Sequence, residues 1–133
     1  MLTYSKHSAV GVYSPDLHYL PLDRMTSRLV ADNLGAHVEF VKAVMKVDPE
    51  AVWASINANH MLPSGSSLFH PHVQSSVDPS PSTMQQMLAS VPDGRFQQYL
   101  EAERRSGDRY IANTGTVEWL ASFAPMGFNE VRA

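Results

Sequence analysis

The predicted fold depends most on one stretch, Asn59-His60-Met61-Leu62-Pro63-Ser64-Gly65-Ser66-Ser67-Leu68-Phe69-His70-Pro71-His72-Val73-Gln74. Residues 51–58 precede it and are predicted to form a strand. The stretch then crosses a turn rich in Pro, Gly and Ser and enters a second strand that carries His70, His72 and Gln74. Because alternate side chains of a strand share one face, we expect these three polar side chains to line one surface.

The residue types of this stretch suit a phosphoryl group. Hydroxyls and backbone N–H groups of a Ser-Gly-Ser turn can cradle phosphoryl oxygens while a neutral imidazole attacks phosphorus. We therefore predict that His72 is a catalytic nucleophile and that the Gln74 amide contacts the phosphoryl oxygens. A lone strand histidine more often bonds a backbone carbonyl, but the spacing His-Pro-His-Val-Gln after Ser-Gly-Ser-Ser favours the catalytic role.

Residues 63–67 (Pro-Ser-Gly-Ser-Ser) and 70–74 (His-Pro-His-Val-Gln) resemble the active-site segment of the galactose-1-phosphate uridylyltransferases. These enzymes form a nucleotidyl-transferring branch of the histidine-triad superfamily, with Gln in place of the last His of the triad. The resemblance implies that the middle position, His72, bears the nucleotidyl group. It also implies that four residues contact the phosphates or shape the loop: Asn59, Gly65, Ser66 and Ser67.

The resemblance implies an enzyme of galactose metabolism like UDP-glucose–hexose-1-phosphate uridylyltransferase. Such an enzyme moves a nucleoside monophosphate, UMP in that family, between a nucleotide sugar and a hexose 1-phosphate through a covalent nucleotidyl-histidine. Two alternatives stay open. The first is a phosphorylase or hydrolase of the same superfamily, acting on a nucleotide sugar or a dinucleoside polyphosphate. The second is a truncated, non-catalytic nucleotide-binding domain.

In the resembled family, the first His of the motif can ligate a structural zinc together with a second His and an upstream Cys-x-x-Cys. Here His70 holds the first position, His18 falls one residue away from the second, and the chain has no cysteine. Two imidazoles make a poor closed zinc site, which requires four ligands. We therefore expect that catalysis requires no cofactor, that zinc is not tightly held, and that His70 mainly orients the catalytic loop. A structural zinc bound by His70 and His18 stays open as the alternative.

Composition indicates a globular protein. The 133 residues are 44% hydrophobic and 17% charged, which fits one domain over residues 1–133. A net charge of −3 gives no reason to expect nucleic acid as a partner. No apolar run approaches the roughly 20 residues of a membrane span, and the lack of cysteine is compatible with a reducing compartment. We expect a soluble, cytoplasmic protein.

Helix signals alternate with strand signals along the chain. Asp23 is predicted to be the N-cap of a long helix that ends near Lys46, with an apolar stripe that includes Leu34 and Val38. Ser82 and Gln85 match a capping box at the start of a helix that ends near residue 90. A further helix over residues 95–106 is predicted to stop at Gly107.

Residues 109–113 and 116–123 are predicted to form a hairpin, with Val117, Trp119, Ala121 and Phe123 as its buried face. The fold class is therefore α+β, an antiparallel sheet flanked by helices, which the resemblance makes histidine-triad-like. Proteins of that family consist of two related halves. The resemblance covers most of the first half, and residues 116–133 correspond either to its end or to the start of the second half. The chain is thus expected to be a fragment or a reduced relative. Unpaired sheet edges, and the family's shared sites, predict a homodimer.

Overall fold

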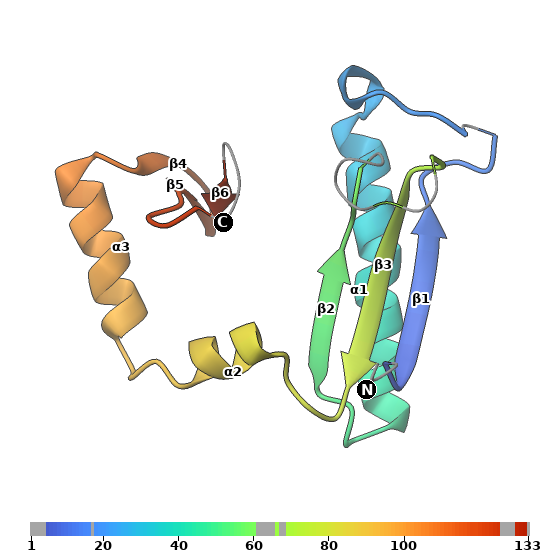
Figure 1. Cartoon of the computed structure of the whole chain (residues 1–133), viewed down its shortest axis with the longest axis horizontal. Coiled ribbons are helices and arrows are strands. Elements are labelled where there is room, and N and C mark those ends of the chain that lie inside the picture. Colours follow the sequence, from blue (N-terminus) through green and yellow to red (C-terminus); the bar gives the residue numbers. More distant parts are fainter. Residues whose placement is uncertain (1–4, 17, 61–65, 67–68, 126–129, 133) are drawn as a thin grey trace. The chain divides into compact units, whose positions relative to one another are not determined.

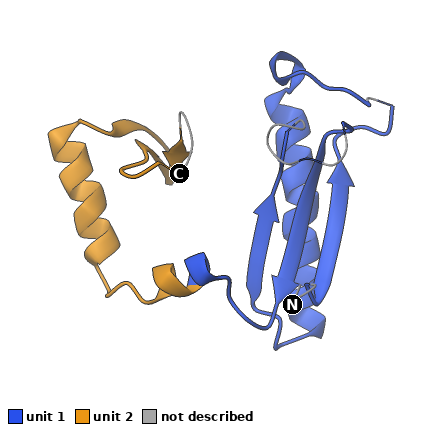
Figure 2. Ribbon diagram, viewed as in Figure 1, with its two compact units in different colours: residues 1–85 blue, residues 86–133 orange. Residues whose placement is uncertain are grey.

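The computed structural model describes residues 5–16, 18–60, 66, 69–125 and 130–132. Contacts along the chain divide it into two compact units, residues 1–85 and 86–133 (Figure 2). The described residues form three α-helices and two antiparallel three-stranded sheets (Figure 1). The predicted α+β class with antiparallel sheets is confirmed, and the expectation of a single domain stays a prediction.

The first unit is a three-stranded sheet with a long helix on one face. Its strands are β1 (His7–Val12), β2 (Trp53–Asn57) and β3 (His72–Asp78), in the order β1-β3-β2. In Figure 1 the sheet lies in front of α1 (Ser27–Val47), so the face turned to the viewer is the one that α1 does not cover. We call it the open face. β3 pairs with both neighbours and therefore occupies the centre of the sheet.

The long helix begins later than the sequence predicts. Leu22–Arg24 forms a separate 3-10 turn, and the hydroxyl of Thr26 accepts a hydrogen bond from the backbone N–H of Leu29 at 3.2 Å. Thr26 is thus the N-cap, and the prediction of Asp23 in that role is wrong. Asp23 lies inside the 3-10 turn, three residues before Thr26, so it cannot cap the first turn of the α-helix.

The predicted apolar stripe of α1 turns inward only in part, since Val41 packs against the core but other members of the stripe do not. Leu34 and Val38 are each 41% exposed, whereas Asn33, His37 and Val44 are buried against the sheet. Val44 packs in a small core with Ala51 and Val77. The two polar residues reach the sheet through hydrogen bonds, described below, and these bonds together with Val44 decide which face of the helix turns inward.

The C-terminal end of α1 is tied to β1 by a charged cluster. The Asp48 carboxylate contacts the Lys6 ammonium at 2.8 Å and the His7 ring at 2.7 Å. The Lys6 ammonium, followed by the His7 ring, lowers the pKa of Asp48 from its ordinary value of 3.8 to about 2. Because the folded state favours the ionised carboxylate, Asp48 stabilises the fold at neutral pH.

Replacing Asp48 with asparagine should make the free energy of unfolding depend less steeply on pH at acidic pH. A carboxylate whose pKa is lowered by folding contributes fully above its unfolded pKa, and this contribution is lost as the pH falls from about 4 towards about 2. The free energy of unfolding, measured in urea across this range, should fall less steeply in Asp48→Asn than in the unsubstituted protein. The exposed Asp93→Asn change is the matched control, and equal slopes for all three proteins would rule out this role of Asp48.

The second unit contains a helix and a small sheet. α2 (Thr83–Ala89) crosses the boundary between the units. It starts at the predicted capping box: Ser82 Oγ accepts a hydrogen bond from the Gln85 N–H, and Gln85 Oε1 accepts one from the Ser82 N–H. α3 (Arg95–Ser106) ends at Gly107, whose φ of 71° confirms the predicted stop. Three strands follow, in the order β4-β5-β6: β4 (Tyr110–Thr114), β5 (Val117–Ala121) and β6 (Val131–Arg132). Among the described residues, no helix is long and apolar enough to cross a membrane.

The predicted buried face of the hairpin is wrong. Leu120 is buried, whereas Val117, Trp119 and Phe123 are exposed. The neighbouring Glu118 is held on the same face as Leu120 by the Arg104 guanidinium from α3 and by the hydroxyl of Tyr110. The ion pair with α3 therefore turns the Glu118 and Leu120 side towards the helix.

Candidate functional site

β3 presents His72 and Gln74 on the open face of the first unit. Val73, Ser75 and Val77 point to the side covered by α1 and are buried. Because side chains alternate along a strand, His72 and Gln74 point to the opposite side. The structure therefore brings these two predicted site residues together on one side of the sheet, where Gln74 is exposed and His72 is only 7% exposed. His70 lies before the first residue of β3, so its side chain does not share this alternation.

The ring of His72 is fixed by hydrogen bonds at both nitrogens. Its Nδ1 lies 2.9 Å from the backbone oxygen of His70, and its Nε2 lies 3.0 Å from the Gln74 amide nitrogen. A carbonyl oxygen only accepts, so Nδ1 carries the proton and donates it. The Nε2 atom then carries a lone pair on the Gln74 side. This is the protonation state that a nucleophilic imidazole needs.

Gln74 is exposed at the middle of the sheet, and its amide can donate to a second acceptor. Its neighbours across the ladder are Val10 in β1 and Asn57 in β2. Directly opposed residues in an antiparallel pair lie side by side on the same face. Asn57 is therefore a polar neighbour of Gln74 that the sequence analysis missed. The alternation of Trp53, Ser55 and Asn57 along the predicted strand was the signal that could have found it.

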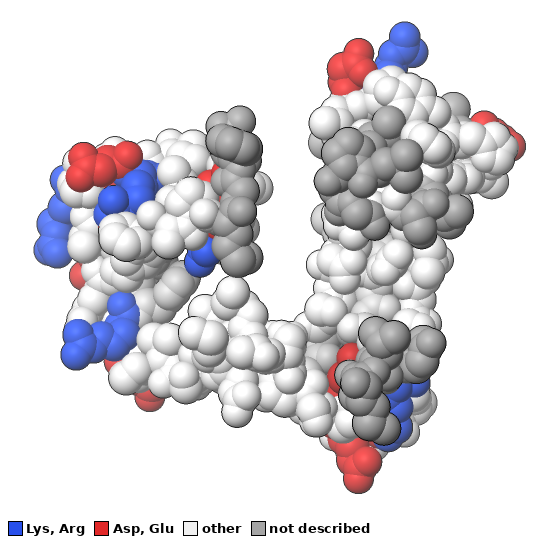
Figure 3. Space-filling view, in the orientation of Figure 1, with Lys and Arg blue, Asp and Glu red and all other residues white. Residues whose placement is uncertain are grey.

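The open face carries little charge near its centre. In the space-filling view of Figure 3, the Lys, Arg, Asp and Glu side chains of the first unit gather towards its two ends. The visible surface between these ends is uncharged. A phosphoryl group bound to His72 Nε2 would meet the neutral Gln74 amide, whose nitrogen lies 3.0 Å from that atom.

His70 is a connector in the structure. Its Nε2 donates to the backbone oxygen of Ser14 at 2.7 Å, which ties the segment before β3 to the segment after β1. Its ring also meets the ring of His18 edge to face, with centroids 5.1 Å apart. Among the described residues, no three His, Asp or Glu side chains are grouped closely enough to hold a metal ion. The expectation that zinc is not tightly held stays a prediction.

The remaining predicted site residues are placed only in part. Asn59 is exposed and lies two residues beyond the end of β2. Ser66 is buried. Gly65 and Ser67 lie outside the described residues, so their predicted contacts with a phosphate stay predictions.

A polar layer lies directly beneath the site, between α1 and the sheet. The His37 ring is 3% exposed and its Nδ1 lies 2.8 Å from the hydroxyl of Ser75, the residue after Gln74. The Asn33 amide donates to the backbone oxygens of Gly11 and Val12, at 3.3 and 3.1 Å. Val12 is the cross-strand neighbour of His72. These bonds anchor the strands that carry the site. The sequence analysis gave His37 no role because a single His in a helix carries no signal of its partner.

Gly11→Ala should destabilise the first unit. A Cβ at this position would lie 2.6 Å from His37 Nε2, and the buried ring cannot move away without losing Ser75. We expect a loss of about 1–3 kcal/mol in the free energy of unfolding, as for other overpacked sites. Gly35→Ala is the matched control, because nothing lies within 4 Å of its added Cβ and glycine weakens a helix by roughly 0.5–1 kcal/mol.

Making Gly11→Ala in a His37→Ala background tests whether the contact between the added Cβ and the His37 ring causes the loss of stability. With the ring removed, the added methyl group should cost much less than it does in the unsubstituted protein. Equal losses in the two backgrounds, measured by urea unfolding, would show that the clash with His37 is not the cause.

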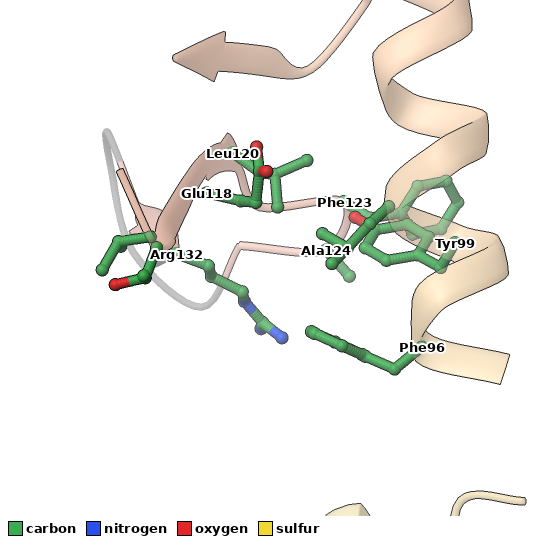
Figure 4. Close-up of a pocket in the computed structure, with 10 residues that line it drawn as sticks. Phe96, Tyr99, Glu118, Leu120, Phe123, Ala124 and Arg132 are labelled. Carbon is green, nitrogen blue, oxygen red and sulfur yellow. The ribbon is translucent and has the colours of Figure 1, made fainter. Parts of the chain in front are cut away.

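The second unit holds a separate, mainly apolar cavity of about 500 Å³. Phe96 and Tyr99 extend into it from α3, and Phe123 and Arg132 approach it from the side of the small sheet (Figure 4). Arg132 is paired with Glu130 at 3.0 Å. The described residues that line this cavity include no histidine, and the sequence analysis assigned no site to it.

Comparison with known proteins finds a relative in Archaeoglobus fulgidus, described as an uncharacterized protein. The two sequences are 32% identical over an alignment of 132 residues, which covers 94% of this chain and 39% of the relative. The chain thus spans well under half of the length of that relative. No protein-family profile matches the chain, and no solved structure matches it. The resemblance to the uridylyltransferases stays a prediction that rests on the motif.

Proposed function

We propose that this chain carries the nucleophilic site of a nucleotidyltransferase. In the proposed reaction, a nucleoside monophosphate, UMP by the resemblance, moves between a nucleotide sugar and a hexose 1-phosphate. The observation that carries the proposal is the environment of His72, whose Nδ1–H is held by a backbone oxygen and whose Nε2 is left with a lone pair beside an amide donor. This arrangement supports attack of Nε2 on phosphorus.

The exchange would proceed by two displacements at one atom. In the first, the Nε2 lone pair forms a bond to the α-phosphorus and the bond to the oxygen of the leaving sugar phosphate breaks. In the second, an oxygen of the incoming hexose 1-phosphate bonds to phosphorus and the N–P bond breaks. Phosphate monoesters leave without a proton, so little acid–base catalysis is needed, and the Gln74 amide would stabilise the phosphoryl oxygens.

The exposed position of Gln74 favours a second candidate, a phosphorylase or hydrolase that uses the same first step. His72 is only 7% exposed, but the Gln74 amide beside its Nε2 is exposed, so inorganic phosphate or water would approach the intermediate from the Gln74 side. The two candidates differ only in the group that attacks the intermediate. They share the first displacement, so both would form the same nucleotidyl-histidine on His72.

The test is a label-transfer assay followed by a chase. Purified protein would be incubated with a panel of nucleotide sugars labelled in the α-phosphate, and the protein-bound label should be labile in acid and stable in base, as a phosphoramidate is. Labelled protein would then receive hexose 1-phosphate, inorganic phosphate or buffer alone. Rapid release by hexose 1-phosphate supports the transferase, release by the other two supports the second candidate, and no label from any nucleotide sugar would refute both.

A further inference from the structure

A second cavity opens on the same face of the first unit, at the other end of β3. It has a volume of about 420 Å³, within the roughly 300–1,000 Å³ of small-molecule pockets. Its walls include Trp53 and Ser55 of β2 and Ser76 and Asp78 of β3. Ser76 is four residues from His72, which corresponds to roughly 13 Å along a strand. The cavity is therefore distinct from the surroundings of the His72 ring.

The polar wall of this cavity is held in place by hydrogen bonds between neighbouring elements. The hydroxyls of Ser55 and Ser76 lie 2.9 Å apart across the ladder. The Asp78 carboxylate accepts from the backbone N–H of Lys6 at 2.7 Å. At the rim, Gln85 donates to the backbone oxygen of Ala54 at 2.7 Å. Groups fixed in this way lose little freedom when a ligand binds, and preorganisation of this kind favours binding.

The chemistry of the wall favours a neutral ligand rich in hydroxyl groups. Asp78 only accepts hydrogen bonds, and the serine hydroxyls both donate and accept. A phosphate would face the Asp78 carboxylate, a like charge. The Lys6 ammonium, which also lines the cavity, is already paired with Asp48 at 2.8 Å and with Glu50 at 3.7 Å. Among the described residues that line it, the cavity therefore has no uncommitted cation to offer an anion.

Trp53 adds an apolar platform to this polar wall. It lines the cavity directly across the ladder from Asp78, so the indole and the carboxylate are neighbours on one surface. A sugar ring presents C–H groups on its faces and hydroxyl groups around its edge. An aromatic face beside a carboxylate and hydroxyls complements both.

We propose that this cavity is a binding site for the ring of a hexose. The site goes beyond the proposed transfer reaction, because binding there requires neither His72 nor a phosphate. The hexose can be a free sugar or the glycosyl group of a larger ligand such as a nucleotide sugar. Both present the same ring to Trp53 and Asp78.

The test is a titration followed by NMR spectroscopy of ¹⁵N-labelled protein. The chain has two tryptophans, so the indole N–H signals of Trp53 and Trp119 can be assigned with the Trp119→Phe variant. Glucose or galactose should shift the Trp53 signal in a saturable way and leave the Trp119 signal unchanged. UMP should leave both unchanged. UDP-glucose that binds more tightly than glucose would identify the ligand as a glycosyl group, and equal affinity would identify it as a free sugar.

Asp78→Asn tests the polar wall, because asparagine keeps an oxygen for the Lys6 N–H but loses the charge. It should weaken hexose binding about tenfold or more, the effect of losing a charged hydrogen-bond partner. Asp93→Asn is the matched control and should leave the affinity unchanged. His72→Asn should leave it unchanged as well, which separates this site from the proposed reaction. No saturable shift of Trp53 with either hexose, an equal shift with UMP, or full affinity in Asp78→Asn would overturn the proposal.

Discussion

Replacing His72 with asparagine is expected to abolish covalent labelling by a nucleotide sugar. An amide nitrogen carries no lone pair available for attack on phosphorus, so the first displacement cannot occur. Asparagine still offers an N–H group to the backbone oxygen of His70, which holds the ring of His72 in the unsubstituted protein. The strand should therefore remain in place. Intact-protein mass spectrometry after incubation with the substrate measures the labelled fraction.

The matched control is His7→Asn, which removes a ring from the face of the same sheet that α1 covers. His7 contacts Asp48 rather than the open face, so this variant should lose stability and keep its labelling. Circular dichroism of both variants would establish that they are folded. Labelling that persists in a folded His72→Asn protein would contradict the assignment of the nucleophile.

Gln74→Ala is expected to slow labelling by roughly 10²–10³-fold, the loss that follows removal of one positioned donor to a phosphoryl or acyl oxygen. The amide nitrogen of Gln74 lies 3.0 Å from His72 Nε2, where a phosphoryl group bonded to that atom would also meet it. Alanine leaves the attacking lone pair intact. The rate should therefore fall while the final extent of labelling stays the same, in a time course at saturating nucleotide sugar.

Gln98→Ala is the matched control for this change, because Gln98 is an exposed glutamine of the second unit. It should label at the unsubstituted rate. A Gln74→Ala protein that labels as fast as this control would show that the Gln74 amide does not stabilise the transferred group.

Signals that lie within a few residues of each other predicted the local structure well. The capping box of Ser82 and Gln85 and the stop at Gly107 are confirmed, because each depends on hydrogen bonds or a backbone angle inside a single turn. The shared face of His72 and Gln74 follows from the same kind of rule, the two-residue period of a strand. Such signals need no knowledge of the rest of the fold.

The inward face of each element was predicted less well, because it depends on residues far away in the sequence. Apolar spacing favoured the Leu34 and Val38 side of α1, but His37 and Asn33 turn inward because their partners are on strands 21 to 38 residues away. Glu118 turns towards α3 for a similar reason, since its partner is Arg104. A polar residue becomes a good core residue only when its hydrogen-bond partner is known.

The tautomer of His72 could not be predicted from the sequence either. It depends on the backbone oxygen of His70, which is placed by the contact between the His70 ring and the backbone oxygen of Ser14. The motif predicted which ring would react. The structure adds which nitrogen of that ring carries the lone pair.

The central claim is that Nε2 of His72 is the atom that takes up the nucleotidyl group. The most direct measurement is tandem mass spectrometry of peptides from protein incubated with UDP-glucose, under basic conditions that preserve a phosphoramidate. We predict a UMP adduct on the imidazole of His72. An adduct confined to another residue, or an unmodified His72 peptide after incubation with the whole panel of nucleotide sugars, would contradict the account.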